Sequence, residues 1–240
     1  MNKPFFETHD RFLRSSSVGN WPDRLNLRYE AIIDRTAGQL RGARVLDIAS
    51  HDGRWSFAAL EAGAAHVTGI EVRPELSAAA KINIASDRFN AVTGDVFTQR
   101  AIFDQPFDVV LCLGFLYHTT RHEEIFDLIR ATHARTVVVD TRLTPGDGNF
   151  VQIHKERADD PAHGLADRGV RDEMILYGWP TRGAVTFMLD HFGYGVDFVD
   201  WPALIASHGV YADPSREQSP DNPVGDYAGG NRGTFIGTLR

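Results

Sequence analysis

The residues best placed to do chemistry lie in a turn after one apolar run and at the end of the next. The apolar run 45–48 predicts a buried strand, and Asp47 lies within it. A tight turn through residues 49–53 follows, residues 54–62 predict a helix, and Glu71 ends the second apolar run. A strand, turn and helix with an acid about twenty residues further on form the nucleotide-binding unit of doubly wound sheets. The turn brings backbone N–H groups to the ligand, and the acid accepts hydrogen bonds from ribose hydroxyls.

The turn itself distinguishes between nucleotide ligands. A dinucleotide turn carries three glycines, but here only Gly53 holds its place, and Ala49 and His51 occupy the other two. A pyrophosphate needs close backbone approach, which a histidine side chain would obstruct. S-adenosylmethionine has no phosphate and tolerates larger residues in the turn. Asp47 suits its cationic amino group, or a water held near that group. The turn therefore favours S-adenosylmethionine over a dinucleotide.

Residues 44–57 resemble motif I of the class I methyltransferases, in the Asp-Gly-x-Trp-Ser-Phe variant that includes Trp55. The resemblance covers about residues 43–142 and 181–240. It implies that Asp95, in the sequence Thr-Gly-Asp-Val, accepts a hydrogen bond from the adenine amino group, with the following valine against the ring. The predicted cofactor-binding residues are Asp47, Ala49, His51, Gly53, Trp55, Glu71, Asp95, Val96, Leu113 and Gly114.

A third group of residues follows the fourth predicted strand, in the string Leu113-Gly-Phe-Leu-Tyr-His118. Gly114 permits close approach of a ligand. Tyr117 and His118 lie at the carboxyl end of a central strand, where open α/β sheets place their ligands. The string resembles that of the wobble-uridine carboxymethyl-transferring tRNA enzymes, and it recurs in small-molecule and sugar O-methyltransferases. We predict that Tyr117 binds substrate and that His118 is a catalytic base or a substrate clamp. The alternative is that His118 holds a helix start or a loop carbonyl.

His154 is the second candidate base. The stretch 150–155 alternates weakly like a strand, which places His154 and Gln152 on one side, opposite two apolar neighbours. We predict that both face the pocket, with Gln152 binding substrate. The alternative for His154 is a surface histidine in a polar insertion. A hydroxyl acceptor loses its proton as it attacks the methyl group, and a positioned histidine contributes about 10²–10⁴-fold. In-line alignment supplies the larger share. Tyr29 is predicted to form a stacking wall for the substrate, or else to belong to the core.

Asp140 is unusual because it lies near the end of the Val-rich fifth strand. With Asp147, Asp159 or Asp160 it offers the oxygen ligands that Mg²⁺ prefers. In some sugar O-methyltransferases such a metal acidifies the acceptor hydroxyl. No tight ligand spacing accompanies Asp140, so the metal ligands remain unknown, with Asp140 as the candidate.

The remaining pattern predicts one α/β domain over residues 1–240. Apolar runs alternate with helical segments over residues 43–142, which indicates a mostly parallel sheet with helices on both faces. The resemblance implies a Rossmann-like doubly wound sheet of seven strands, six parallel and strand 7 antiparallel. Residues 1–42 predict an N-terminal helical cap, with a helix over Pro22–Leu40 that in this kind of fold lies over the cofactor mouth. The polar stretch 144–180 predicts a lid or substrate-binding insertion after strand 5.

Composition excludes several classes of protein. At 42% hydrophobic over 240 residues, the chain is neither disordered nor membranous, and no run is long enough to span a bilayer. Its net charge of −7 disfavours a general nucleic-acid binder. Cys112 is the single cysteine and lies in an apolar run, so we predict a buried hydrophobe rather than a nucleophile. The first residues show no signal-peptide pattern, so we expect a cytoplasmic protein. A homodimer is kept open.

Three functions are compatible with these residues. The first is a methyltransferase that moves a methyl group from S-adenosylmethionine to a hydroxyl of a small polar acceptor, with a sugar or glycoside favoured, by in-line attack assisted by a histidine base. The second is a tRNA-modifying methyl or carboxymethyl transferase, indicated by the string 114–118 but disfavoured by the net charge. The third is a non-catalytic cofactor-binding protein, indicated by the altered turn. The presence of Glu71, Asp95 and the string argues against the third. The class I frame, the histidine-bearing insertion and the acidic surface favour the first, so we expect a small-molecule or saccharide substrate and no nucleic-acid or membrane partner.

Overall fold

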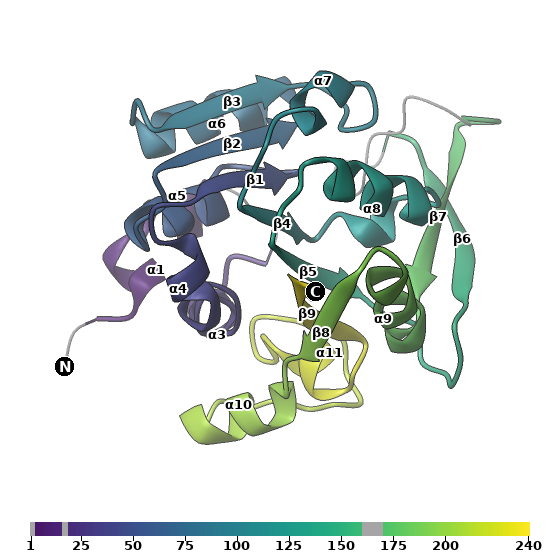
Figure 1. Ribbon diagram of the computed structural model, residues 1–240. Coiled ribbons are helices and arrows are strands. Elements are labelled where there is room, and N and C mark those ends of the chain that lie inside the picture. Colours follow the sequence, from purple (N-terminus) through teal and green to yellow (C-terminus); the bar gives the residue numbers. More distant parts are fainter. Residues whose placement is uncertain (1–2, 16–18, 160–169) are drawn as a thin grey trace.

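A seven-stranded sheet forms the centre of the molecule (Figure 1). The computed structural model describes residues 3–15, 19–159 and 170–240. The strand order is β3-β2-β1-β4-β5-β9-β8, and β9 runs antiparallel to both of its neighbours while the other six strands run parallel to one another. The prediction of a mostly parallel central sheet is therefore confirmed. The strands are β1 (Arg44–Ile48), β2 (His66–Glu71), β3 (Phe89–Thr93), β4 (Val109–Leu113), β5 (Thr136–Arg142), β8 (Tyr194–Phe198) and β9 (Arg232–Leu239).

Helices cover both faces of this sheet. Successive residues of β1 alternate between the two faces, so Val45 packs with α3, α5 and α10 while Leu46 packs with α8 and α9. Because both faces are covered, the central strand β4 is apolar and buried along its length, and Cys112 is buried as predicted. The helices are α1 (Phe5–Thr8), α2 (Arg11–Arg14), α3 (Pro22–Ile32), α4 (Ala37–Leu40), α5 (Arg54–Glu61), α6 (Pro74–Ile84), α7 (Arg100–Phe103), α8 (His122–Ala131), α9 (Arg182–His191), α10 (Trp201–His208) and α11 (Gly225–Ala228).

The helix predicted over Pro22–Leu40 is interrupted. α3 ends at Ile32, and a 3₁₀ turn at Asp34–Thr36 separates it from α4. The Thr36 hydroxyl donates to the Ile32 carbonyl at 2.5 Å, and such side-chain bonds compete with the helical backbone pattern.

The segment after β5 contains a second sheet of two strands. β6 (Val151–Arg157) and β7 (Met174–Pro180) pair antiparallel, with His154 opposite Tyr177. The sequence predicted a strand close to β6 but none at β7. The hairpin packs against the 3₁₀ turn that follows β4, because Nε2 of His122 lies 3.0 Å from the Leu116 carbonyl and a Cβ on Gly178 would lie 3.1 Å from His122 Cε1. The hairpin therefore sits at the carboxyl end of the parallel strands.

A buried carboxylate, Asp140, joins β5 to three other elements. Its oxygens accept hydrogen bonds from Nε of Arg232 at 2.7 Å, the Tyr227 hydroxyl at 2.8 Å and the Thr234 hydroxyl at 2.7 Å, and Nη2 of Arg28 lies at 3.2 Å. Burial alone would raise the pKa of Asp140, but the charges of Arg232 and Arg28 and the two hydroxyl donors hold it well below its usual range. The ionised carboxylate thus links β5 to α3, α11 and β9.

This network corrects the prediction that Asp140 is a magnesium ligand. Two guanidinium groups already neutralise the carboxylate, and they would repel a divalent cation. Asp147 is exposed, Asp159 pairs with Arg157 at 2.8 Å, and Asp160 lies outside the described residues. In the described part of the chain, no group of three or more His, Cys, Asp or Glu side chains is placed to hold a metal ion.

The substitution Asp140→Asn tests the network. Because it leaves two buried guanidinium groups without their anion, we expect the free energy of unfolding to fall by about 3–5 kcal/mol, measured by urea denaturation. The control is Asp221→Asn, which removes the partner of Arg216 in an exposed pair and should leave the unfolding midpoint unchanged. Equal effects of the two substitutions would contradict a structural role for Asp140.

Candidate active site

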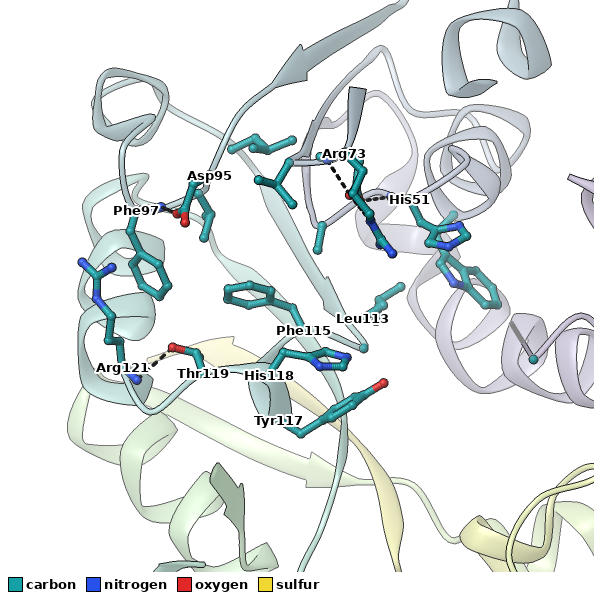
Figure 2. Close-up of a pocket in the computed structure, with 18 of the residues that line it drawn as sticks. His51, Arg73, Asp95, Phe97, Leu113, Phe115, Tyr117, His118, Thr119 and Arg121 are labelled. Atoms are coloured by element: carbon teal, nitrogen blue, oxygen red, sulfur yellow. Dashed lines mark hydrogen bonds and ion pairs between the residues drawn. The ribbon is translucent and has the colours of Figure 1, made fainter. Parts of the chain in front are cut away.

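The carboxyl ends of β1, β2 and β4 open onto a cavity of about 260 Å³ (Figure 2). Open α/β sheets bind their ligands at this position. The cavity wall brings together most of the residues singled out from the sequence. Those that line it are Ala49, His51, Trp55, Glu71, Asp95, Val96, Leu113, Gly114, Tyr117 and His118.

The turn after β1 has a glycine-like backbone at positions without glycine. Ala49 and His51 both have a φ of 55°, in the left-handed region that costs a residue with a Cβ about 1–2 kcal/mol. The strain is held in place because the Ser50 N–H donates to the Ile70 carbonyl and the His51 N–H to the Glu71 carboxylate, each at 2.9 Å. Backbone strain of this kind clusters at ligand sites, and here it lies on the cavity wall.

Two predicted cofactor residues lie behind the turn instead of on the cavity wall. The Asp47 carboxyl is buried and accepts a hydrogen bond from the Ser56 hydroxyl at 2.6 Å. Burial raises the pKa of Asp47 to about 7, against the opposing effect of this hydrogen bond. Gly53, with a φ of 82°, is required by packing, because a Cβ there would lie 2.8 Å from Cδ1 of Ile84. The role of Asp47 toward an amino group therefore stays a prediction.

Glu71 ends β2 at the floor of the cavity. Its carboxylate accepts hydrogen bonds from the His51 N–H at 2.9 Å, the Arg73 N–H at 3.1 Å and Nε of Arg73 at 2.8 Å (Figure 2). A carboxylate has about four acceptor positions. The Arg73 side chain is 23% exposed, so it is the partner that can swing outward and free the carboxylate for a pair of ligand hydroxyls.

The end of the cavity beyond β3 is lined by two aromatic rings and two charged side chains. The Phe97 N–H donates to Oδ1 of Asp95 at 2.7 Å, and the rings of Phe97 and Phe115 lie 5.9 Å apart. The Arg121 guanidinium stacks 3.7 Å from the centroid of the Phe97 ring. This end fits a planar ring with a polar edge at Asp95. The sequence analysis missed Phe97, Phe115 and Arg121, although the two aromatic residues adjoin motifs that it used.

The loop after β4 forms the opposite edge. Gly114 has a φ of 90°, its N–H donates to the Asp140 carbonyl at 2.8 Å, and a Cβ there would point to Nη2 of Arg232 at 3.5 Å. Tyr117 and His118 follow in a 3₁₀ turn, with their rings 4.0 Å apart, and both line the cavity (Figure 2). The loop is thus open at Gly114 and polar beside it.

His122 performs the structural role that was considered for His118. Its buried ring contacts the Leu116 carbonyl inside this loop. Burial lowers the pKa of His122 and so favours a neutral ring. The sequence analysis did not single out this residue, although it begins the helix that follows the loop.

The geometry does not place His154 at the cavity, which corrects that prediction. His154 and Tyr177 lie opposite each other in register and therefore share one face of the hairpin, with their rings 5.3 Å apart. Leu176 lines the cavity and, as the neighbour of Tyr177, points from the opposite face. The alternation in the sequence was correct, but the apolar face is the one turned toward the cavity.

Gln152 and Tyr29 are also outside the cavity lining. The Gln152 side chain accepts a hydrogen bond from the Thr144 hydroxyl at 2.5 Å, on the same face of the hairpin as His154. The Tyr29 ring stacks on Phe5 at 4.3 Å, beneath the N-terminal helix α1. Both residues therefore contribute to packing at these positions, and neither forms a wall for a ligand in the cavity.

Three arginines that the sequence analysis did not single out complete the wall. Arg24 and Arg28 come from α3 and Arg232 from β9, and all three are buried. The first two are four residues apart and so share one helix face. This four-residue spacing was the signal in the sequence that could have indicated a pair of arginines on one helix face.

The comparisons with known proteins agree with this architecture. Residues 45–136, from β1 to the start of β5, match a family described as a methyltransferase domain. No curated protein matches the chain by sequence. No helix in the residues that the structure describes is both long and apolar enough to cross a membrane.

Several solved structures share the fold. The N-terminal domain of EvdMO1, crystallised in the presence of S-adenosylhomocysteine and D-fucose, has a TM-score of 0.59 and 19% identity over 89% of this chain and 82% of its own. A Mesorhizobium loti S-adenosylmethionine-dependent methyltransferase has a TM-score of 0.58 and 15% identity over 88% and 97%. The magnesium protoporphyrin IX methyltransferase of Synechocystis PCC 6803, with bound S-adenosylhomocysteine, has a TM-score of 0.53 and 13% identity over 100% and 90%. The chain therefore has a fold found in S-adenosylmethionine-dependent methyltransferases.

The substitution Asp47→Asn tests the protonation of the buried carboxyl. The folded protein retains this proton up to about pH 7, whereas the unfolded chain releases it near its ordinary pKa of 3.8, so the wild type loses stability as the pH rises between these values. The variant has no such proton. Its free energy of unfolding relative to the wild type should therefore rise by about 2–4 kcal/mol from pH 4 to pH 8, measured by chemical denaturation. A difference that is independent of pH would show that Asp47 is ionised beneath the turn.

Proposed function

We propose that this chain is an S-adenosylmethionine-dependent methyltransferase that acts on a hydroxyl of a small polar acceptor. The observation that carries the proposal is the convergence of three features on one cavity: the strained turn at Ala49 and His51, the Glu71 carboxylate, and the open edge at Gly114. The methyltransferase-domain match over residues 45–136 covers the elements that supply all three.

The residues present fit the cofactor. Glu71 would accept hydrogen bonds from the ribose hydroxyls once Arg73 swings aside, and Asp95 from the adenine amino group, with Val96, Phe97 and Phe115 against the ring. When bound, S-adenosylmethionine would supply a sulfonium methyl group that a nucleophile attacks at carbon, with S-adenosylhomocysteine as the leaving group.

The residues beside Gly114 would act on the acceptor. The missing side chain at Gly114 leaves room for an acceptor oxygen to line up with the methyl group. His118 would accept the acceptor's proton at a ring nitrogen as the oxygen attacks. Tyr117 would position the acceptor, and Leu176 of the hairpin would exclude water from above. His154 is no longer a candidate base, because its ring faces away.

We favour a sugar or glycoside as the acceptor. The side-chain oxygen of Gln218 is buried on the cavity wall and has no hydrogen-bond partner among the described residues, so it suits a hydroxyl donor. Tyr117 and His118 add further polar groups to the cavity wall. The D-fucose in the EvdMO1 crystals is consistent with a sugar in a related fold.

The substitution Glu71→Gln tests cofactor binding. Removing the negative charge weakens charge-assisted bonds to the ribose, so we expect the Kd for S-adenosylhomocysteine to rise about 10- to 100-fold in isothermal titration calorimetry. The matched control is Glu75→Gln, the same change at an exposed position on α6, which should leave the Kd unchanged. If the wild type does not bind S-adenosylhomocysteine, the proposed function is wrong.

The substitution His118→Ala tests catalysis. The wild type, incubated with methyl-labelled S-adenosylmethionine and a soluble cell extract, should label small-molecule or glycan material that resists RNase. His118→Ala should lower the rate of this labelling by about 10²-fold or more, with an unchanged Kd for S-adenosylhomocysteine. The control His191→Ala removes an exposed histidine and should keep the full rate. Label in RNase-sensitive material would support a tRNA substrate instead, and a full rate in His118→Ala would exclude that residue as the base.

A further inference from the structure

The wall beyond Gly114 carries an excess of positive charge. We call Arg24, Arg28 and Arg232, with the acidic partners Asp140 and Asp226, the arginine cluster. The three arginines are 2%, 8% and 7% exposed. Their ion pairs are to two buried carboxylates, Asp226 for Arg24 and Asp140 for both Arg28 and Arg232. On the described part of the cavity wall, the carboxylates are Glu71 and Asp95, which belong to the ribose and adenine ends. One positive charge of the arginine cluster is therefore unbalanced.

Arg28 is the arginine with donors to spare. Arg24 uses both of its terminal nitrogens, with bonds of 2.8 and 2.9 Å to Asp226 and one of 2.7 Å to the Pro223 carbonyl. Arg232 binds Asp140 through both Nε and Nη2, at 2.7 and 2.6 Å. Arg28 reaches Asp140 only through Nη2 at 3.2 Å, and its buried Nε has no hydrogen-bond partner among the described residues.

A buried guanidinium donor without a partner is unfavourable, and an oxygen ligand would relieve it. The Arg28 guanidinium is held 4.8 Å above the Trp55 ring, so its position is fixed at the cavity wall. Arg232 adds a second guanidinium that lies 5.3 Å from the Tyr117 ring and borders Gly114. A planar guanidinium matches the two oxygens of a carboxylate or phosphate better than an ammonium does.

We propose that Arg28, with Arg232 and Tyr117, forms an oxyanion subsite that binds a carboxylate or phosphate group of the acceptor. The inference rests on the proposed function for the identity of the reaction, and it narrows the acceptor to an anionic molecule such as a sugar acid or a sugar phosphate. The subsite lies beside Gly114 and so places the anion next to the reacting hydroxyl. The carboxylate of the cofactor's amino-acid part has the same chemistry, and the experiment must separate the two sources.

The probe is inorganic phosphate, titrated into the protein with and without saturating S-adenosylhomocysteine. We expect the wild type to bind phosphate in both states. Arg28→Gln should weaken this binding at least tenfold and change the Kd for S-adenosylhomocysteine less than threefold. Arg28→Lys keeps a positive charge beside Asp140 and should weaken the binding of phosphate three- to tenfold. This variant serves as the test if the glutamine variant does not fold. The control Arg216→Gln removes an exposed arginine and should bind phosphate like the wild type.

Two outcomes would overturn the proposal. Phosphate binding that is equal in the wild type and the Arg28 variants would show an adventitious ion only. Loss of S-adenosylhomocysteine affinity in Arg28→Gln, without loss of affinity for 5′-methylthioadenosine, which lacks the carboxylate, would assign the subsite to the cofactor. Phosphate binding that depends on Arg28 in a protein unable to bind S-adenosylhomocysteine would keep the subsite and refute the methyltransferase function, so the two failures are distinguishable.

Discussion

The Asp140 carboxylate is the interaction on which the arrangement of this molecule depends. It lies near the end of β5 on the face that α3 covers, and it contacts one residue of α3, one of α11 and two of β9. Its backbone carbonyl also accepts a hydrogen bond from the Gly114 N–H, so the same residue positions the start of the loop after β4. A buried ion pair adds little net stability, because desolvation offsets attraction, but loss of one partner is costly because it leaves a buried charge uncompensated. Here it fixes the arginine side of the cavity relative to the cofactor side.

The sheet was predictable from the sequence because its central strands, such as β4 and β5, are buried along their length and read as continuous apolar runs between helical segments. The hairpin was harder, since β7 mixes apolar, aromatic and glycine residues and gains its strand conformation by pairing with β6. Local pattern carries no information about such a partner.

The residues of the site also differ in how far the sequence could predict them. Glu71, Asp95, Gly114, Tyr117 and His118 were found because each directly follows a strand, and the carboxyl ends of parallel strands converge. The face of the hairpin that turns toward the cavity was assigned wrongly at His154, because the period of a strand gives two faces without saying which is covered. Asp140 was noticed as unusual, but its partners come from 87 to 112 residues away, and spacing along the chain does not reveal them.

The position of β9 has a consequence for how the protein is made. β9 lies between β5 and β8, yet it follows both of them in the chain, so during synthesis those two strands present bare hydrogen-bonding edges until β9 emerges. Exposed strand edges are templates for pairing with other chains. The nucleotide side of the cavity, built from β1 to β4, is complete in the chain long before Arg232 is added. A nascent chain therefore contains the residues of the proposed cofactor site before those of the arginine side.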